Sequence, residues 1–215
     1  ASLAEGYTMG QAVTFMQQAM TDINNPALSF DWGGQSREFL SSGGALMQAF
    51  VLAVLFIYLV LAAQFESFRD PFIILFSVPL AMFGAILALK WTGGTLNVYS
   101  QIGLITLVGL ITKHGILLVE FANQLQEQGK TKLEAIQAST ALRLRPILMT
   151  TAAMVLGAIP LALATGAGAE VRHPIGWVIV GGMTLGTLFT LFVIPCVYVL
   201  MGRVHTPVVS VLKEQ

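Results

Sequence analysis

The chain has 215 residues, of which 55% are hydrophobic and only 10% are charged, and its formal net charge is zero. A soluble domain has about 25% charged residues, and a large core cannot explain the deficit because a chain of this size still exposes much of its surface. Together with a mean hydropathy of +0.77, this indicates a membrane protein. The balanced charge gives no electrostatic reason to expect a nucleic acid as a partner.

Residues 1–42 are soluble in character and resemble the end of a folded domain outside the membrane. Apolar residues at 3–4 spacing predict a helix over 9–23, and Asn24-Asn25-Pro26 should stop it. Leu28, Phe30 and Trp32 alternate with smaller or polar residues, which predicts a short strand. Ala1 is not an initiator methionine and no signal peptide follows it. We therefore expect a cut point within a longer polypeptide.

From residue 43 to 205 the chain reads as a transmembrane bundle, with a short tail at 206–215. A bilayer requires about 20 apolar residues per helix, and five stretches meet this requirement: 44–63, 72–89, 98–125, 146–164 and 175–201. Pro146 is expected at a helix start, where its missing N–H does no harm. Gly182 and Gly186 give the fifth span a face of small residues for close helix contact. The predicted fold is an all-α membrane protein, five spanning helices preceded by a short α+β tail.

The charges in the loops predict the orientation of the bundle. If residues 1–42 lie outside the cytoplasm, the inside loops carry seven basic residues: Arg69, Lys130, Lys132, Arg143, Arg145, Arg203 and Lys213. The outside loops then carry three: Arg37, Lys90 and Arg172. The positive-inside rule therefore favours an extracytoplasmic start and a cytoplasmic C-terminus.

The residue that most needs an explanation is Lys113, near the middle of the third span. A charge at this depth costs a few kcal/mol on insertion scales. The lysine stem could carry the ammonium toward the interface, but many spanning residues lie on either side of it, so we favour a functional role. A buried lysine needs a carboxylate partner at similar depth to stay charged.

None of the acidic residues in the chain is a suitable partner for Lys113. Glu66, Asp70, Glu127 and Glu134 fall in the predicted inside loops, and Glu170 falls in an outside loop. Glu120 shares a helix face with Lys113 but lies two turns away, about 10 Å along the axis. We expect Glu120 to meet Arg143 or Arg145 at the inner interface. The partner of Lys113 should therefore come from a segment outside these residues.

Other polar residues in the spans have simpler interpretations. The hydroxyls of Thr150 and Thr151 are expected to bond to carbonyls one turn earlier, as in many membrane helices. His114 points about 100° away from Lys113 around the helix, and we interpret it as a packing residue although imidazole can titrate near neutrality. His173 lies outside the spans. The single Cys196 excludes an internal disulfide.

Enzyme signatures are absent from the sequence. It contains no GxSxG, HExxH, CxxC or GxxxxGK[ST] motif, so hydrolase, zinc and nucleotide chemistry have no support. We predict that the protein is not an enzyme and holds no cofactor.

Four long runs resemble one family of membrane pumps: LAAQFESFRDP (61–71), GLITKHGILLVEFANQL (109–125), RLRPILMTTAAMVLGAIPLALATGAG (143–168) and GGMTLGTLFTLFVIPCVYVL (181–200). They resemble the C-terminal transmembrane half of resistance-nodulation-division pumps, hydrophobe/amphiphile efflux branch. DWGGQSREF (31–39) is similar to the region before the eighth helix of such pumps, so 1–42 would end a periplasmic porter domain. The five spans would then be helices eight to twelve.

The resemblance implies roles for particular residues. Lys113 matches the family lysine that engages an aspartate pair on a helix of the N-terminal half, and Thr150 and Arg143 match residues that line the proton route. It implies proton/drug antiport in the bacterial inner membrane, in a homotrimer working with a periplasmic adaptor and an outer-membrane channel, with protons as the coupling ion. Substrates would be hydrophobic or amphiphilic small molecules. His114 departs from the small or amide residue expected beside the lysine.

Two other interpretations stay open at this point. The residues could form a non-transporting membrane module of the same superfold, used for partner or lipid sensing, with Lys113 as an assembly contact. They could also belong to a related proton-coupled pump for lipids or proteins. An aspartate pair in the missing half would favour transport, and the identity of the substrates lies in residues that this chain does not contain.

Overall fold

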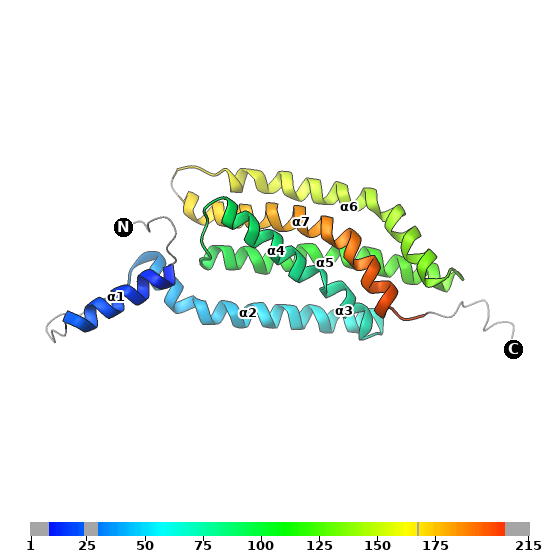
Figure 1. The fold of residues 1–215 in the computed structure, drawn as a ribbon, viewed down its shortest axis with the longest axis horizontal. Coiled ribbons are helices and arrows are strands. Elements are labelled where there is room, and N and C mark those ends of the chain that lie inside the picture. Colours follow the sequence, from blue (N-terminus) through cyan, green and yellow to red (C-terminus); the bar gives the residue numbers. More distant parts are fainter. Residues whose placement is uncertain (1–8, 24–29, 167, 205–215) are drawn as a thin grey trace.

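The computed structural model describes residues 9–23, 30–166 and 168–204, and these residues are folded as helices without strands. Figure 1 shows long helices lying side by side as a bundle, with α1 projecting beyond one end. In chain order the helices are α1 (Met9–Ile23), α2 (Gly34–Phe65), α3 (Arg69–Leu75), α4 (Ser77–Trp91), α5 (Val98–Glu127), α6 (Lys132–Ala162) and α7 (Ala169–Met201).

The five predicted membrane spans are confirmed as helices of sufficient length and apolarity. Within the described residues, Gly44–Phe65, Arg69–Trp91, Val98–Glu127, Lys132–Ala162 and Val171–Met201 are each long and apolar enough to cross a membrane. The all-α bundle is therefore as expected, and its helices extend beyond most of the predicted limits.

Helix α5, which carries Lys113, is the centre of the bundle. It contacts α2, α3, α4, α6 and α7, and 56% of the residues in its most apolar 18-residue stretch are buried. Helix α2 is the opposite case, because only 6% of the residues in its corresponding stretch are buried. In a membrane protein an exposed apolar helix faces lipid or another segment, so α2 lies at the edge of this bundle.

Small residues on α7 allow α4 and α5 to approach closely, as the sequence predicts. A Cβ atom added to Gly186 would lie 2.8 Å from the Cβ of Ala81 on α4, and one added to Gly182 would meet the Leu107 side chain on α5. A larger residue at Gly186 would push α7 away from α4, because it would meet the Ala81 backbone, and one at Gly182 would displace the Leu107 side chain.

The second span differs from the prediction because it begins earlier and is broken. Helix α3 ends at Leu75, and α4 starts at Ser77 after Phe76. Pro79 has no N–H for the Leu75 carbonyl, and its ring crowds that carbonyl, so a continuous helix is disfavoured there. Helix α3 begins at Arg69, so Asp70 lies in its first turn, where it is fully buried. The prediction that Asp70 lies in an inside loop was wrong.

The start of α6 also corrects the sequence interpretation. Pro146 lies inside the helix rather than at its beginning. The start is fixed at Thr131 by a capping box, in which Glu134 N–H donates to the Thr131 hydroxyl and the Glu134 carboxylate accepts from the Thr131 N–H. Figure 1 shows α6 bending toward its N-terminal end.

The strand predicted around Leu28, Phe30 and Trp32 is not formed in its described part. Residues 30–33 are irregular, and residues 24–29 lie outside the described residues. Phe30 and Trp32 instead contact each other edge to face, with ring centroids 5.5 Å apart. A strand needs a neighbouring strand to satisfy its backbone, and the described part of the chain supplies none.

Candidate functional site

Lys113 lies near the midpoint of α5, on a side of the helix that the other described residues leave exposed. Its side chain is exposed, whereas Thr112 and His114 on either side of it are buried. Lys113 makes no ion pair with any carboxylate in the described residues. No acid of the described residues is therefore paired with the lysine.

Arg143, the second predicted relay residue, does not meet Glu120. Glu120 is exposed and forms no ion pair with Arg143 or Arg145, so that prediction was wrong. The Arg143 guanidinium lies 4.4 Å above the ring of Phe121 on α5, a cation–π contact. Its Nε is buried without an acceptor within the described residues. Arg143 therefore retains an unused donor between α5 and α6.

Thr150, the third predicted relay residue, is half-buried on α6. Its hydroxyl donates to the Ile147 carbonyl at 3.0 Å, so the expected local bond is confirmed. Lys113 and Thr150 do not bond to each other. A hydroxyl held by its own helix can still accept a proton in a hydrogen bond, because its oxygen keeps lone pairs free.

A cluster that the sequence analysis did not identify lies directly behind Lys113. His114 is fully buried, and its Nε2 and Nδ1 are 3.4 Å from the hydroxyl of Thr151 on α6 and 3.3 Å from that of Thr187 on α7. The two hydroxyls are 3.2 Å apart. His114 is thus a polar link between three helices. The signal in the sequence was the Thr184, Thr187 and Thr190 series, one residue per turn of an apolar helix.

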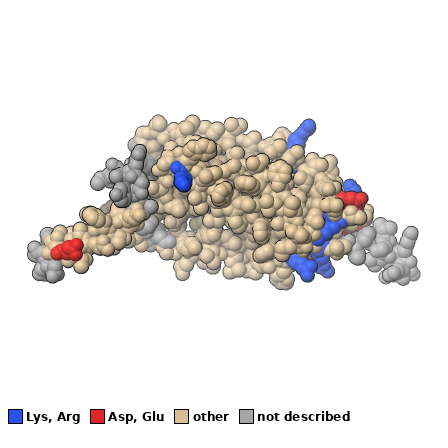
Figure 2. All heavy atoms as spheres, viewed as in Figure 1, with Lys and Arg blue, Asp and Glu red and all other residues tan. Residues whose placement is uncertain are grey.

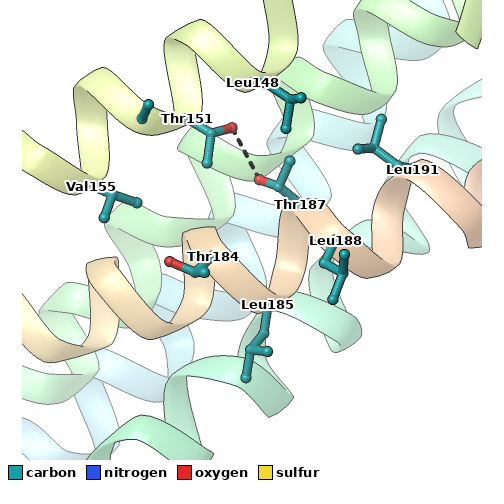
Figure 3. Close-up of a pocket in the computed structure, with 9 residues that line it drawn as sticks. Leu148, Thr151, Val155, Thr184, Leu185, Thr187, Leu188 and Leu191 are labelled. Carbon is teal, nitrogen blue, oxygen red and sulfur yellow. Dashed lines mark hydrogen bonds between the residues drawn. The ribbon is translucent and has the colours of Figure 1, made fainter. Parts of the chain in front are cut away.

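Thr151 and Thr187 also line a hollow between α6 and α7. Figure 3 shows the two hydroxyls pointing toward each other, with the bond drawn between them. The hollow has a volume of about 380 Å³, and apart from three threonines its lining is apolar: Leu148, Thr151, Ala152, Val155, Thr184, Leu185, Thr187, Leu188 and Leu191.

A second polar cluster links α3, α5 and α7 where α5 and α7 end. Asn123 donates to the Asp70 carboxylate at 3.2 Å and accepts from the Tyr198 hydroxyl. Gln126 donates to that hydroxyl at 2.6 Å and to the Arg203 carbonyl. The other Asp70 oxygen, Oδ1, has no partner within the described residues. Neither Asn123 nor Tyr198 was singled out from the sequence, since neither is charged or belongs to a recognisable motif.

Basic residues gather at this same end of the bundle. Figure 2 shows most of the Lys and Arg side chains at the end where α5 stops and α6 begins. Lys130 lies in the turn between α5 and α6, Lys132 begins α6, Arg69 begins α3, and Arg203 follows α7. The bundle therefore has one end rich in positive charge and one end poor in it.

Comparisons with known proteins agree with the fold and with the runs of sequence. A family model described as the AcrB/AcrD/AcrF family matches residues 1–202. The chain is 53% identical to an uncharacterized transporter of Haemophilus influenzae over 209 residues, 94% of this chain and 20% of that protein. It is 39% identical over 196 residues to a toluene efflux pump membrane transporter and an antibiotic efflux pump membrane transporter, both of Pseudomonas putida, covering 91% of this chain and 19% of each.

The chain thus spans about one fifth of the length of these relatives, and their match to it covers nearly all of its residues. The matched residues include the five apolar helices and the polar clusters between them. The chain belongs to the AcrB/AcrD/AcrF family of resistance-nodulation-division efflux transporters.

Proposed function

We propose that these residues supply the lysine side of a proton relay in a transporter that exports drugs and other hydrophobic or amphiphilic compounds. The proposal rests on the environment of Lys113. This residue lies near the middle of a helix long and apolar enough to span a membrane, its side chain is exposed, and no acid of the described residues pairs with it. An ammonium at that depth facing lipid is costly. It is therefore covered by another segment of the longer protein, and that segment brings the acid.

The partner on the missing segment is an aspartate pair of the N-terminal half. Two carboxylates beside one ammonium respond strongly to a single proton, because charges interact strongly away from water. When a proton neutralises an aspartate, the attraction that held Lys113 weakens and the helices rearrange. Protons moving down their gradient thus drive antiport, and no nucleotide or cofactor is required.

Thr150 and Arg143 lie along the proton's route toward the cytoplasm. Thr150 offers hydroxyl lone pairs on α6, and Arg143 keeps a buried Nε without an acceptor within the described residues. Such a donor binds a water or a carboxylate of the covering segment, since buried polar groups are normally paired. Together they provide polar groups on α6 along this route.

The bundle is oriented with its basic end in the cytoplasm of a bacterial inner membrane, which puts residues 1–42 in the periplasm and the C-terminus inside. The gathering of Lys and Arg at the end where α5 stops supports this orientation (Figure 2). The working unit is a homotrimer that passes substrates through a periplasmic adaptor to an outer-membrane channel. The efflux relatives of Pseudomonas putida, named for toluene and for antibiotics, support hydrophobic and amphiphilic substrates.

Replacing the lysine in the full-length protein tests the proposal. Lys113→Ala should abolish proton-driven export of ethidium from cells that lack other pumps, while membrane insertion and trimer formation are kept. Lys90→Ala is a matched control, because Lys90 is an exposed lysine at the end of α4. It should leave export unchanged.

Two results would contradict the proposal. Full ethidium export by Lys113→Ala would remove the counter-ion role of the lysine. Export that persists in the wild type after the proton gradient is collapsed would remove the coupling to protons. A wild-type protein with no export, although trimers form, would instead favour a sensing or assembly module.

A further inference from the structure

Three side chains behind Lys113 form a triangle of polar contacts near the midpoints of α5, α6 and α7. His114, Thr151 and Thr187 have exposed fractions of 0%, 8% and 2%. Their contacts are 3.2–3.4 Å long, slightly longer than is usual for hydrogen bonds. Buried polar groups in an apolar helix bundle are costly unless they are paired. The triangle therefore requires an arrangement in which every group finds a partner.

We call these three side chains the ring, although their three contacts cannot all be hydrogen bonds. The bonding directions of the two imidazole nitrogens diverge, so two hydroxyls 3.2 Å apart cannot both bond to the imidazole in line. A neutral imidazole offers one N–H donor and one nitrogen acceptor, and each hydroxyl donates one hydrogen and accepts another. If Nε2–H donates to Thr151, then Thr151 donates to Thr187, and if Nδ1–H donates to Thr187, then Thr187 donates to Thr151. Either arrangement links α5, α6 and α7 through two hydrogen bonds. Removing any one member leaves the other two incompletely paired.

The ring fixes how α5 and α6 face each other. A short turn, residues 128–131, joins the two helices, and they run antiparallel (Figure 1). Successive residues of a helix point about 100° apart. For two antiparallel helices that meet at His114 and Thr151, the residues one position earlier, Lys113 and Thr150, project to the same side of the pair. The side chain classes agree, since Lys113 is exposed and Thr150 is half-buried.

We propose that the His114–Thr151–Thr187 ring is a positioning device that holds Lys113 and Thr150 on one face, toward the segment that carries the acid. The inference rests on the proposed function, because it assigns the ring a part in proton-coupled transport. His114 acts through its neighbours and does not itself meet the acid. Thr187 extends the hold to α7, so a shift of α5 is transmitted to both flanking helices.

A simple packing role for His114 makes different predictions. Packing depends on the size of the imidazole group, whereas positioning depends on its hydrogen-bond donor and acceptor. His114→Phe keeps an aromatic ring without either group, and His114→Gln keeps one donor and one acceptor in a smaller side chain. Thr187→Val keeps the shape and removes the hydroxyl, so it tests the ring even if His114→Phe folds poorly.

Thr190→Val is the matched control for Thr187→Val. Thr190 is a buried threonine one turn further along α7, and its hydroxyl has no partner within the described residues. The two variants therefore make the same chemical change on the same helix, and they differ in whether a ring bond is lost.

The experiment measures ethidium transport per trimer in proteoliposomes of the full-length protein under an imposed pH gradient. His114→Phe, Thr151→Val and Thr187→Val should each lower the maximal rate by about tenfold or more, as small misplacements of reacting groups do. The half-saturating ethidium concentration should not change. His114→Gln should stay within about threefold of the wild type, less than 1 kcal/mol in the barrier, and Thr190→Val should match the wild type.

Full rates per trimer for Thr187→Val and His114→Phe would overturn the proposal. So would a His114→Gln variant as slow as His114→Phe, or a Thr190→Val variant as slow as Thr187→Val. Lys113→Ala in the same assay separates the two claims. If it is inactive while the ring variants are fully active, the positioning role alone fails; if it transports normally, the relay itself fails and the positioning role falls with it.

Discussion

The two polar regions of this bundle differ in whether the chain completes them by itself. Where α5 and α7 end, Asn123 bridges Asp70 and Tyr198, and Gln126 caps the Tyr198 hydroxyl, so most of these groups are paired within one chain. Near the midpoint of α5, Lys113 is exposed and has no acid from the described residues. We call the first region closed, because most of its polar groups are paired with one another, and the second region open, because Lys113 has no acid from the described residues.

We interpret this difference as one between polar groups that hold the fold together and groups that take part in the proposed transport. A closed network at helix ends fixes which helices meet, because breaking it leaves buried groups unpaired. The Lys113 ammonium cannot stabilise the bundle alone, because an unpaired charge within a membrane is costly. In the proposed function its partner is supplied by another segment. Substitutions in the closed region should therefore change stability, and substitutions in the open region should change transport.

Tyr198→Phe should give the largest effect on stability. It removes the hydroxyl that joins Asn123 to Gln126, which costs about 1–3 kcal/mol because both groups stay buried. The unfolding free energy of the full-length protein in detergent measures this loss, and transport per folded trimer should be kept. Tyr58→Phe is the control, because the Tyr58 hydroxyl makes an exposed contact with the Phe68 carbonyl. Equal losses for both tyrosines would remove the distinction between the regions.

Thr150→Ala should have a smaller effect, confined to transport. A hydroxyl can order a water or a partner but carries no charge, so ethidium export should fall by less than in Lys113→Ala. Stability should hardly change, since the Thr150 hydroxyl only bonds back to its own helix. Export measured side by side for the two variants tests this ranking, and equal loss would show that the hydroxyl is as important as the charge.

Much of the fold could be predicted because the strongest signals were local. Runs of about 20 apolar residues located all five spans, and small residues at Gly182 and Gly186 located the close contacts of α7. The limits were less predictable. Pro146 lies inside α6 rather than at its start, because the Thr131–Glu134 capping box lies upstream in the sequence. Asp70 lies in the first turn of α3 and not in a loop, because α3 begins at Arg69, before the predicted start of the span.

The candidate site was predictable only where a charge stood out. Lys113 could be singled out from its depth alone, and the lack of an acid could be read from the positions of the carboxylates. The bonds of His114 with Thr151 and Thr187 depend on how three helices rotate against each other, which no single stretch encodes. The same is true of Asn123 and Tyr198, 75 residues apart in the sequence. Neutral polar residues in apolar runs carry too weak a local signal for such pairing.

The most direct test of this account is an experimental structure of the full-length protein in lipid. The distance from Lys113 Nζ to the nearest carboxylate is the quantity to measure. We predict an aspartate from a helix outside these 215 residues within about 4 Å of Nζ, the range of an ion pair. A Lys113 that faces lipid or extends to the interface, with no acidic side chain beside it, would contradict the central claim.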